Sequence, residues 1–301
     1  MSRNFKGSKD TGRKLNALRQ YLQAYSIALQ DQGFATIYID AFAGSGTRTE
    51  TVPALPLFGR DSPEELKTPG SARIALEVNP PFHTLALFEA DPDRFKQLSQ
   101  LRAEHPDRKV VLRHGDANDF VRRLCKGVPW HAKQSGLKGM RGVVFLDPYG
   151  MEVEWKTAEA IAATEALDCW YFFPLSGLYR NAPHNPTKLD ASKQASLDRV
   201  LGTTDWRQCW YDHSIAPETL FETENEAIVR ADVDAIEVYV AERLRSIFKG
   251  VVLPPMRLRH NSGAPLASLF FAMSNQSKNA VDLGTRIAGH ILNSAKVGIS
   301  S

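Results

Sequence analysis

TIYIDAFAGSG, residues 36–46, is the stretch of this sequence that decides the fold. Its first half is a short β-branched and aromatic strand, and its second half is a turn that contains Gly44 and Gly46. A glycine turn after a strand lets the backbone approach a ligand closely, because no Cβ intervenes. The dinucleotide fingerprint would need a third Gly or Ala where this chain has Thr49, and no Gly-Lys-Ser/Thr follows. The turn therefore predicts a nucleotide-like ligand that is not bound through a pyrophosphate.

Further strands and helices alternate along the chain on both sides of this turn. Apolar strands are predicted at 84–89, 109–112, 142–146 and 169–173, and helices at 13–33, 71–78, 92–101 and about 225–249. Ser71 is a plausible N-cap of the second helix. Segments 256–260 and 266–273 flank a Gly- and Pro-containing turn and predict an antiparallel hairpin. The fold class is α/β: a mostly parallel Rossmann-like sheet with a C-terminal antiparallel hairpin and helices on both faces.

The predicted organisation is one domain over residues 1–301. It carries an N-terminal helical extension over 1–34 and two insertions, at about 48–70 and 176–215. The first insertion is rich in Pro, Thr and Gly and predicts a loop. The second interrupts the alternation of strands and helices, and we expect it over the carboxyl edge of the sheet.

Three acidic residues follow three successive strands. In an open parallel sheet, ligands bind outside the carboxyl ends of the strands. Asp40 could bind an ammonium group, Glu89 could accept from both ribose hydroxyls, and Asp116 could accept from an adenine amino group beside Ala117. Each acid could instead be a loop or N-cap residue. The combination fits a sulfonium with an amino-acid tail and a nucleoside, S-adenosylmethionine. The predicted cofactor-binding residues are Asp40, Phe42, Gly44, Gly46, Glu89, Asp116 and Ala117.

The fourth strand ends in Asp147-Pro148-Tyr149-Gly150. This resembles the Asp/Asn-Pro-Pro-Tyr/Phe signature of amino-group methyltransferases, and more closely the Asp-Pro-Phe-Gly of enzymes that methylate the exocyclic amine of guanine in tRNA. The resemblance implies that Asp147 orients the amine, the Pro148 carbonyl assists and Tyr149 stacks on the base. Tyr149 departs from the signature, which has a second Pro there. A simple turn is the alternative.

Assembled, these segments resemble the three-Cys-motif partner family of bacteria and phages over about residues 13–210. The matching pieces are YIDAFAGSG (38–46), GS (70–71) with IAL (74–76), FEADP (88–92), GD (115–116) and FLDPYG (145–150), and more loosely FP (173–174) and the segment 202–206. The family is of the S-adenosylmethionine-dependent methyltransferase type. Its name, taken from a neighbouring three-cysteine protein, implies a protein partner.

Cysteine and histidine usage narrows the function classes. Cys125, Cys169 and Cys209 are widely spaced and form no Cys-x-x-Cys pair, which argues against a disulfide framework and a thiolate zinc site. The eight histidines form no metal-spaced cluster, so no metal site is predicted. With no signal peptide and no membrane span visible, the expected compartment is a reducing cytoplasm.

Charge is unevenly distributed in a chain whose formal net charge is only +3. Residues 1–20 hold six Lys or Arg against one acidic residue, residues 102–141 hold ten against four, and residues 218–237 hold one against seven. The two basic segments could bind a nucleic acid or could be solvated faces. The leading hypothesis is methyl transfer to an exocyclic amine of a nucleobase. The alternatives are a cofactor-binding but catalytically silent partner subunit in a phage or mobile-element system and, more weakly, a nucleic-acid-processing factor.

Overall fold

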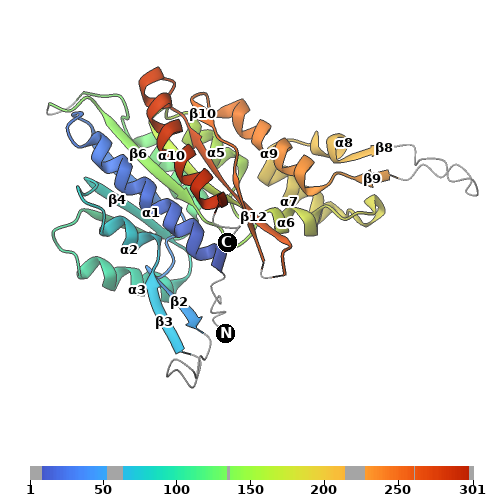
Figure 1. Cartoon of the computed structure of the whole chain (residues 1–301), viewed down its shortest axis with the longest axis horizontal. Coiled ribbons are helices and arrows are strands. Elements are labelled where there is room, and N and C mark those ends of the chain that lie inside the picture. Colours follow the sequence, from blue (N-terminus) through green and yellow to red (C-terminus); the bar gives the residue numbers. More distant parts are fainter. Residues whose placement is uncertain (1–8, 53–63, 134–135, 214–227, 261, 298–301) are drawn as a thin grey trace, which may run out of the picture.

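The computed structural model describes residues 9–52, 64–133, 136–213, 228–260 and 262–297. An eight-stranded sheet runs through the middle of the molecule (Figure 1), in the order β10-β12-β7-β6-β1-β4-β5, with β11 also paired to β12. Its strands are β1 (Ala35–Asp40), β4 (Thr84–Glu89), β5 (Val110–His114), β6 (Met140–Leu146), β7 (Leu167–Phe173), β10 (Val251–Val252), β11 (Met256–Arg259) and β12 (Pro265–Met273).

The order of the strands carries the fold class. The five strands from β5 to β7 are parallel and follow the Rossmann order, in which the first strand of the chain lies in the centre. Strand β12 then pairs antiparallel with β7 on one side and with β10 and β11 on the other. The predicted parallel sheet with a C-terminal antiparallel hairpin is therefore confirmed.

Helices cover both faces of the sheet and enclose two apolar cores. One core lies under α1 (Lys9–Leu29), α2 (Ser71–Leu76), α3 (Pro92–Ala103) and α10 (Lys278–Val297), which appear in front of the sheet in Figure 1. The other lies under α4 (Ala117–Gly127), α5 (Trp155–Ala162), α6 (Leu175–Asn181), α7 (Ala191–Leu201), α8 (Trp206–Trp210) and α9 (Val233–Ile247). Because successive strand residues face opposite ways, each central strand contributes to both cores.

The structure differs from the sequence-based predictions in several local respects. The segment predicted as a loop at 48–70 contains a hairpin of β2 (Thr47–Val52) and β3 (Glu64–Pro69). Helix α2 is capped by Gly70 rather than by Ser71. The side chain of Ser71 hydrogen-bonds to Asp40 instead. The helix predicted at about 225–249 begins only after Asp232, whose side chain caps it, while residues 225–227 lie outside the described ranges. The insertion at 176–215 is largely helical and ends in β8 (Tyr211–His213), which pairs with β9 (Ile228–Arg230).

Two further findings concern membrane-spanning helices and the cysteine thiols. Within the described ranges, no helix is long and apolar enough to cross a membrane. Cys125 and Cys169 are buried, and burial raises the pKa of the Cys125 thiol to about 12. Both thiols are therefore packing groups rather than nucleophiles.

Candidate functional site

A cavity of about 310 Å³ lies where β1, β4, β5 and β6 end. Its lining joins residues from the loops after these four strands and from the first turns of α3 and α4: Ala41, Phe42, Glu89, Ala90, Asp91, Arg94, Gly115, Asp116, Ala117, Asn118, Tyr149 and Glu152. Five of the predicted site residues, Phe42, Glu89, Asp116, Ala117 and Tyr149, are therefore brought together. This is the edge at which open parallel sheets bind their ligands.

Glu89 is the best-positioned polar group of this cavity. It is the last residue of β4 and is nearly buried, and each of its carboxylate oxygens accepts one backbone hydrogen bond. The N–H of Gly44 donates to Oε2 at 2.8 Å and the N–H of Asp91 donates to Oε1 at 2.8 Å. A carboxylate has about four acceptor positions, so two remain for a ligand. A vicinal diol, which offers two neighbouring O–H groups, matches this pre-oriented carboxylate.

The glycine turn supports Glu89 rather than lining the cavity. Gly44 and Gly46 have φ angles of +62° and +76°, a region that side chains other than glycine rarely adopt. A Cβ on Gly46 would lie 2.4 Å from Cδ2 of Leu101 in α3, whereas a Cβ on Gly44 would meet nothing within 4 Å. Gly46 thus permits the close packing of the turn on α3, and Gly44 presents its N–H to Glu89.

Asp116 performs the capping role that the sequence analysis gave as its alternative. Its Oδ1 accepts from the N–H of Asp119 at 3.0 Å and so caps α4. The residue is exposed and also lines the cavity, with buried Ala117 beside it. A cap fixes the direction of this carboxylate, and its second oxygen remains able to accept from a ligand.

Asp40 lies beneath the site and does not line the cavity. Its carboxyl is fully buried and accepts from the hydroxyl of Tyr38 at 3.0 Å and from the N–H of Phe42 at 3.3 Å. Ser71 also hydrogen-bonds to it, which is the role of that side chain. Burial raises the pKa of Asp40 to about 7, against the lowering effect of these hydrogen bonds. Its predicted contact with an ammonium group stays a prediction.

Asp147 is held by a lysine from a distant part of the chain. The ammonium of Lys14, in α1, lies 2.5 Å from Oδ1 and 2.6 Å from Oδ2 of Asp147. The same ammonium lies 4.1 Å from the centre of the Phe172 ring. Only 10% of the Lys14 side chain and 20% of the Asp147 side chain are exposed. The end of β6 therefore forms a cation site between a carboxylate and an aromatic face.

The rest of the Asp147-Pro148-Tyr149 segment is fixed by the loop that follows it. Pro148 is buried, while Tyr149 is 55% exposed and stacks with the guanidinium of Arg94 at 4.5 Å. Buried Asn118 donates to the carbonyl of Glu152 at 3.0 Å and accepts from the N–H of Glu154 at 2.9 Å, which ties the loop to α4. Tyr149 thus presents an aromatic face at the mouth of the cavity.

Lys14, Arg94 and Asn118 are site residues that the sequence analysis did not single out. One signal for Lys14 was available, because it lies four residues before Leu18 and seven before Tyr21. It therefore falls on the apolar stripe of α1, where an unpaired lysine would be costly. No comparable signal marks Arg94 or Asn118, whose partners come from other elements.

The basic residues of segment 102–141 do not gather at one place, because some lie at the carboxyl ends of the parallel strands and others at the amino ends. Exposed Arg113 lies at the end of β5, on the edge that holds the cavity. Lys138 and Arg141 lie at the opposite edge, over the ring of Phe34. Arg122 is paired with Asp119 and Glu154. No group of three metal-ligating side chains gathers anywhere in the described part of the chain.

The sheet order and the cavity at the strand ends together define a Rossmann-like α/β fold with a ligand-sized cavity at the carboxyl ends of its parallel strands. No family model and no curated protein matches the sequence. Among solved structures, the chain is similar to the DUF519-family protein LPL1258 of Legionella pneumophila, with 13% identity, a TM-score of 0.48 and coverage of 93% of this chain and 92% of that one. It is also similar to "Putative methyltransferase yhhF from Escherichia coli", with 17% identity, a TM-score of 0.30 and coverage of 52% and 67%. A conserved hypothetical protein of Streptococcus pyogenes matches with 16% identity, a TM-score of 0.27 and coverage of 50% and 76%.

Proposed function

We propose that this chain is an S-adenosylmethionine-dependent methyltransferase that acts on an exocyclic amine of a nucleobase. The observation that carries the proposal is the pair of carboxylates at the ends of β4 and β6, the two strands that flank β1. Glu89 is pre-oriented in a nucleoside-sized cavity, and Asp147 is placed in a cation site at the end of β6.

The residues that line the cavity fit the nucleoside half of the cofactor. The two acceptor positions left on Glu89 suit the ribose hydroxyls, and Asp116 suits the adenine amino group with Ala117 and Phe42 as apolar neighbours. When bound, S-adenosylmethionine supplies an electrophilic methyl group on a sulfonium. The enzyme's own task is to bind it in one orientation and to present an amine to it.

The end of β6 fits the acceptor. The acceptor nitrogen would become positively charged as it takes the methyl group that the bound cofactor would supply, and it would then lose a proton to solvent. A carboxylate and an aromatic face stabilise that developing charge. The ammonium of Lys14 already occupies such a position between Asp147 and Phe172, which supports a preference of these two side chains for a cationic nitrogen. An acceptor amine must share Asp147 with Lys14 or displace it.

Tyr149 and the local charge favour a nucleobase as the acceptor. The half-exposed Tyr149 ring, backed by Arg94, can stack on a base at the mouth of the cavity. Exposed Arg113, near the end of β5, supplies positive charge at this edge. Lys138 and Arg141 lie at the opposite ends of the strands, so the proposed nucleic-acid contact uses the part of segment 102–141 near the end of β5.

The test has a binding arm and a transfer arm. Calorimetry with S-adenosylhomocysteine should show saturable binding to the wild type and much weaker binding to Glu89→Gln. Labelled methyl transfer to tRNA, rRNA and DNA should then be lost in Asp147→Asn. The matched control is Glu104→Gln, which changes an exposed carboxylate paired with Arg73 on the surface. Absence of binding by the wild type, or equal transfer by Asp147→Asn, would contradict the proposal.

A second candidate is a cofactor-binding but catalytically silent partner subunit of a three-cysteine-motif protein. The observation that favours it is that Lys14 holds both oxygens of Asp147, so that the acceptor position is filled by the chain itself. This candidate predicts binding of S-adenosylhomocysteine with no transfer to any polymer.

A further inference from the structure

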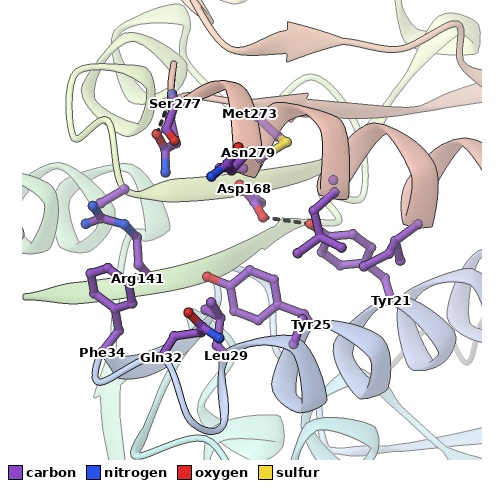
Figure 2. Close-up of a pocket in the computed structure, with 17 residues that line it drawn as sticks. Tyr21, Tyr25, Leu29, Gln32, Phe34, Arg141, Asp168, Met273, Ser277 and Asn279 are labelled. Atoms are coloured by element: carbon purple, nitrogen blue, oxygen red, sulfur yellow. Dashed lines mark hydrogen bonds between the residues drawn. The ribbon is translucent and has the colours of Figure 1, made fainter. Parts of the chain in front are cut away.

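A second cavity, of about 400 Å³, lies at the opposite edge of the sheet, where β6 and β7 begin. Helix α1 and the first half of α10 form its walls, and none of its lining residues belongs to the cavity at the carboxyl ends. Figure 2 shows Arg141 and Phe34 at one end, Tyr21 at the other, and Asp168 between them. Its volume is within the range of small-molecule sites.

Two side chains of opposite charge face this cavity without pairing. Asp168 is nearly buried at the start of β7 and accepts one hydrogen bond, from the hydroxyl of Tyr21 at 2.6 Å. The guanidinium of Arg141 packs on the ring of Phe34 at 4.7 Å. Among the described residues, Asp168 has no cationic partner within ion-pair distance, and Arg141 has no anionic one. The charge of Arg141 is nevertheless felt at Asp168, where it lowers a pKa that burial raises to about 7.

A buried carboxyl without a cation is costly to ionise, and a ligand ammonium would relieve that cost. Tyr21 occupies Oδ2 of Asp168, so Oδ1 is left to accept from a ligand. One nitrogen of the Arg141 guanidinium donates to the carbonyl of Met140 at 2.9 Å, and a ligand carboxylate would in the same way give the remaining N–H donors an anionic partner. The site is therefore complementary to a molecule that carries both an ammonium and a carboxylate group.

The remaining walls are apolar and define the body of that molecule. Tyr25 and Phe34 contribute aromatic surface, and Leu29, Leu283 and Ile287 contribute aliphatic surface. Such a lining binds an uncharged hydrocarbon or aromatic group by burying it, while the few polar groups fix its orientation.

We propose that this cavity binds a free α-amino acid with an apolar side chain, its ammonium on Asp168 and its carboxylate on Arg141. The site is distinct from the proposed methyl-transfer site, and the inference does not depend on that function. Simple amines, simple carboxylates and uncharged rings would each leave Asp168, Arg141 or both without a charged partner.

The proposal is tested by calorimetry on the full chain with leucine and phenylalanine. Both should bind saturably. N-Acetyl-leucine, which lacks the ammonium, and 3-methylbutylamine, which lacks the carboxylate, should each bind at least tenfold more weakly. Asp168→Asn and Arg141→Gln should each weaken leucine at least tenfold. S-Adenosylhomocysteine affinity should stay within twofold of the wild type wherever it is measurable.

Several outcomes would overturn the proposal. The first is no saturable heat from either amino acid at millimolar concentration. Equal affinity for leucine and either truncated analogue would also overturn it, and this comparison needs only the wild-type protein. It therefore remains decisive if a variant fails to fold. Binding of 3-methylbutylamine alone would overturn it by assigning the cavity to amines. A wild-type protein that binds leucine but shows no methyl transfer would contradict the proposed function and leave this proposal supported.

Discussion

Asp168→Asn should make the protein more stable at pH 8 than the wild type, and the gain should shrink toward pH 5. Burial raises the pKa of Asp168 from 3.8 to about 7 in the folded protein, against the lowering effect of the hydrogen bond from Tyr21 and the charge of Arg141. Asparagine keeps an oxygen that accepts from Tyr21, but it has no charged form. The substitution therefore removes the ionisation and little else.

The sign follows from proton binding in the two states. Between about pH 4 and pH 7 the folded protein keeps a proton on Asp168 that the unfolded chain has lost. The free energy of unfolding then decreases as pH rises through this range and is constant above it. One pKa unit corresponds to about 1.4 kcal/mol, so a shift of roughly three units gives a gain of about 4 kcal/mol for the variant at pH 8. At pH 5 most of that gain is absent.

Urea denaturation of wild type and Asp168→Asn at pH 5, 6, 7 and 8 measures this difference. Groups that titrate identically in both proteins cancel, so only the change in the difference with pH is interpreted. Asp40→Asn is a parallel case, because the pKa of Asp40 is also about 7 for the same reason. A difference between variant and wild type that does not change with pH, or that grows toward acid, would refute the buried-carboxyl argument.

Four further substitutions test the site at the carboxyl ends of the strands. Lys14→Met should lower methyl transfer at least tenfold, because Asp147 loses the cation that holds it. The affinity for S-adenosylhomocysteine, measured by calorimetry, should not change. An increase in methyl transfer would instead mean that Lys14 blocks the acceptor site. Glu89→Gln should weaken cofactor binding by about 1.5–3 kcal/mol, since an amide cannot accept from two backbone N–H groups with both of its ends. Gly46→Ala should lower the free energy of unfolding, measured by urea denaturation, by about 2–3 kcal/mol, and Gly44→Ala should lower it by about 1 kcal/mol. Both substitutions strain the backbone, but only a Cβ on Gly46 would collide with a leucine of α3. Equal losses of stability would contradict this packing argument.

The central strands could be predicted from the sequence because their signal is local. Strand β4 has the predicted bounds, and β1, β6 and β7 differ only by a few residues at their starts. Their runs of β-branched and aromatic residues are buried on both faces, so the apolar pattern alone suffices. The hairpin of β2 and β3 had no such pattern. Its strands pair with each other outside the main sheet and are rich in charged residues.

Helix α10 shows a different limit. No element was predicted for residues 278–297, although Leu283, Ile287 and Ile291 recur at helical spacing. A helical period shows that one face is apolar, but it does not say what that face packs against. Here the partners are α1 and the C-terminal strands, which come from opposite ends of the sequence.

The residues of the candidate site likewise fall into those with a local sequence signal and those whose partners are distant in the sequence. Glu89, Asp116 and Asp147 could be predicted because each follows a strand, and parallel strands end at one edge. Lys14 could not be assigned a role, because its partner is 133 residues away. Helix α1 crosses the sheet so that Lys14 reaches the carboxyl edge while Tyr21 and Tyr25 line the cavity at the amino edge. A segment that the sequence presents as an N-terminal extension thus supplies a charged group to one candidate site and aromatic groups to the other. Any displacement of α1 along its axis should therefore disturb both sites together.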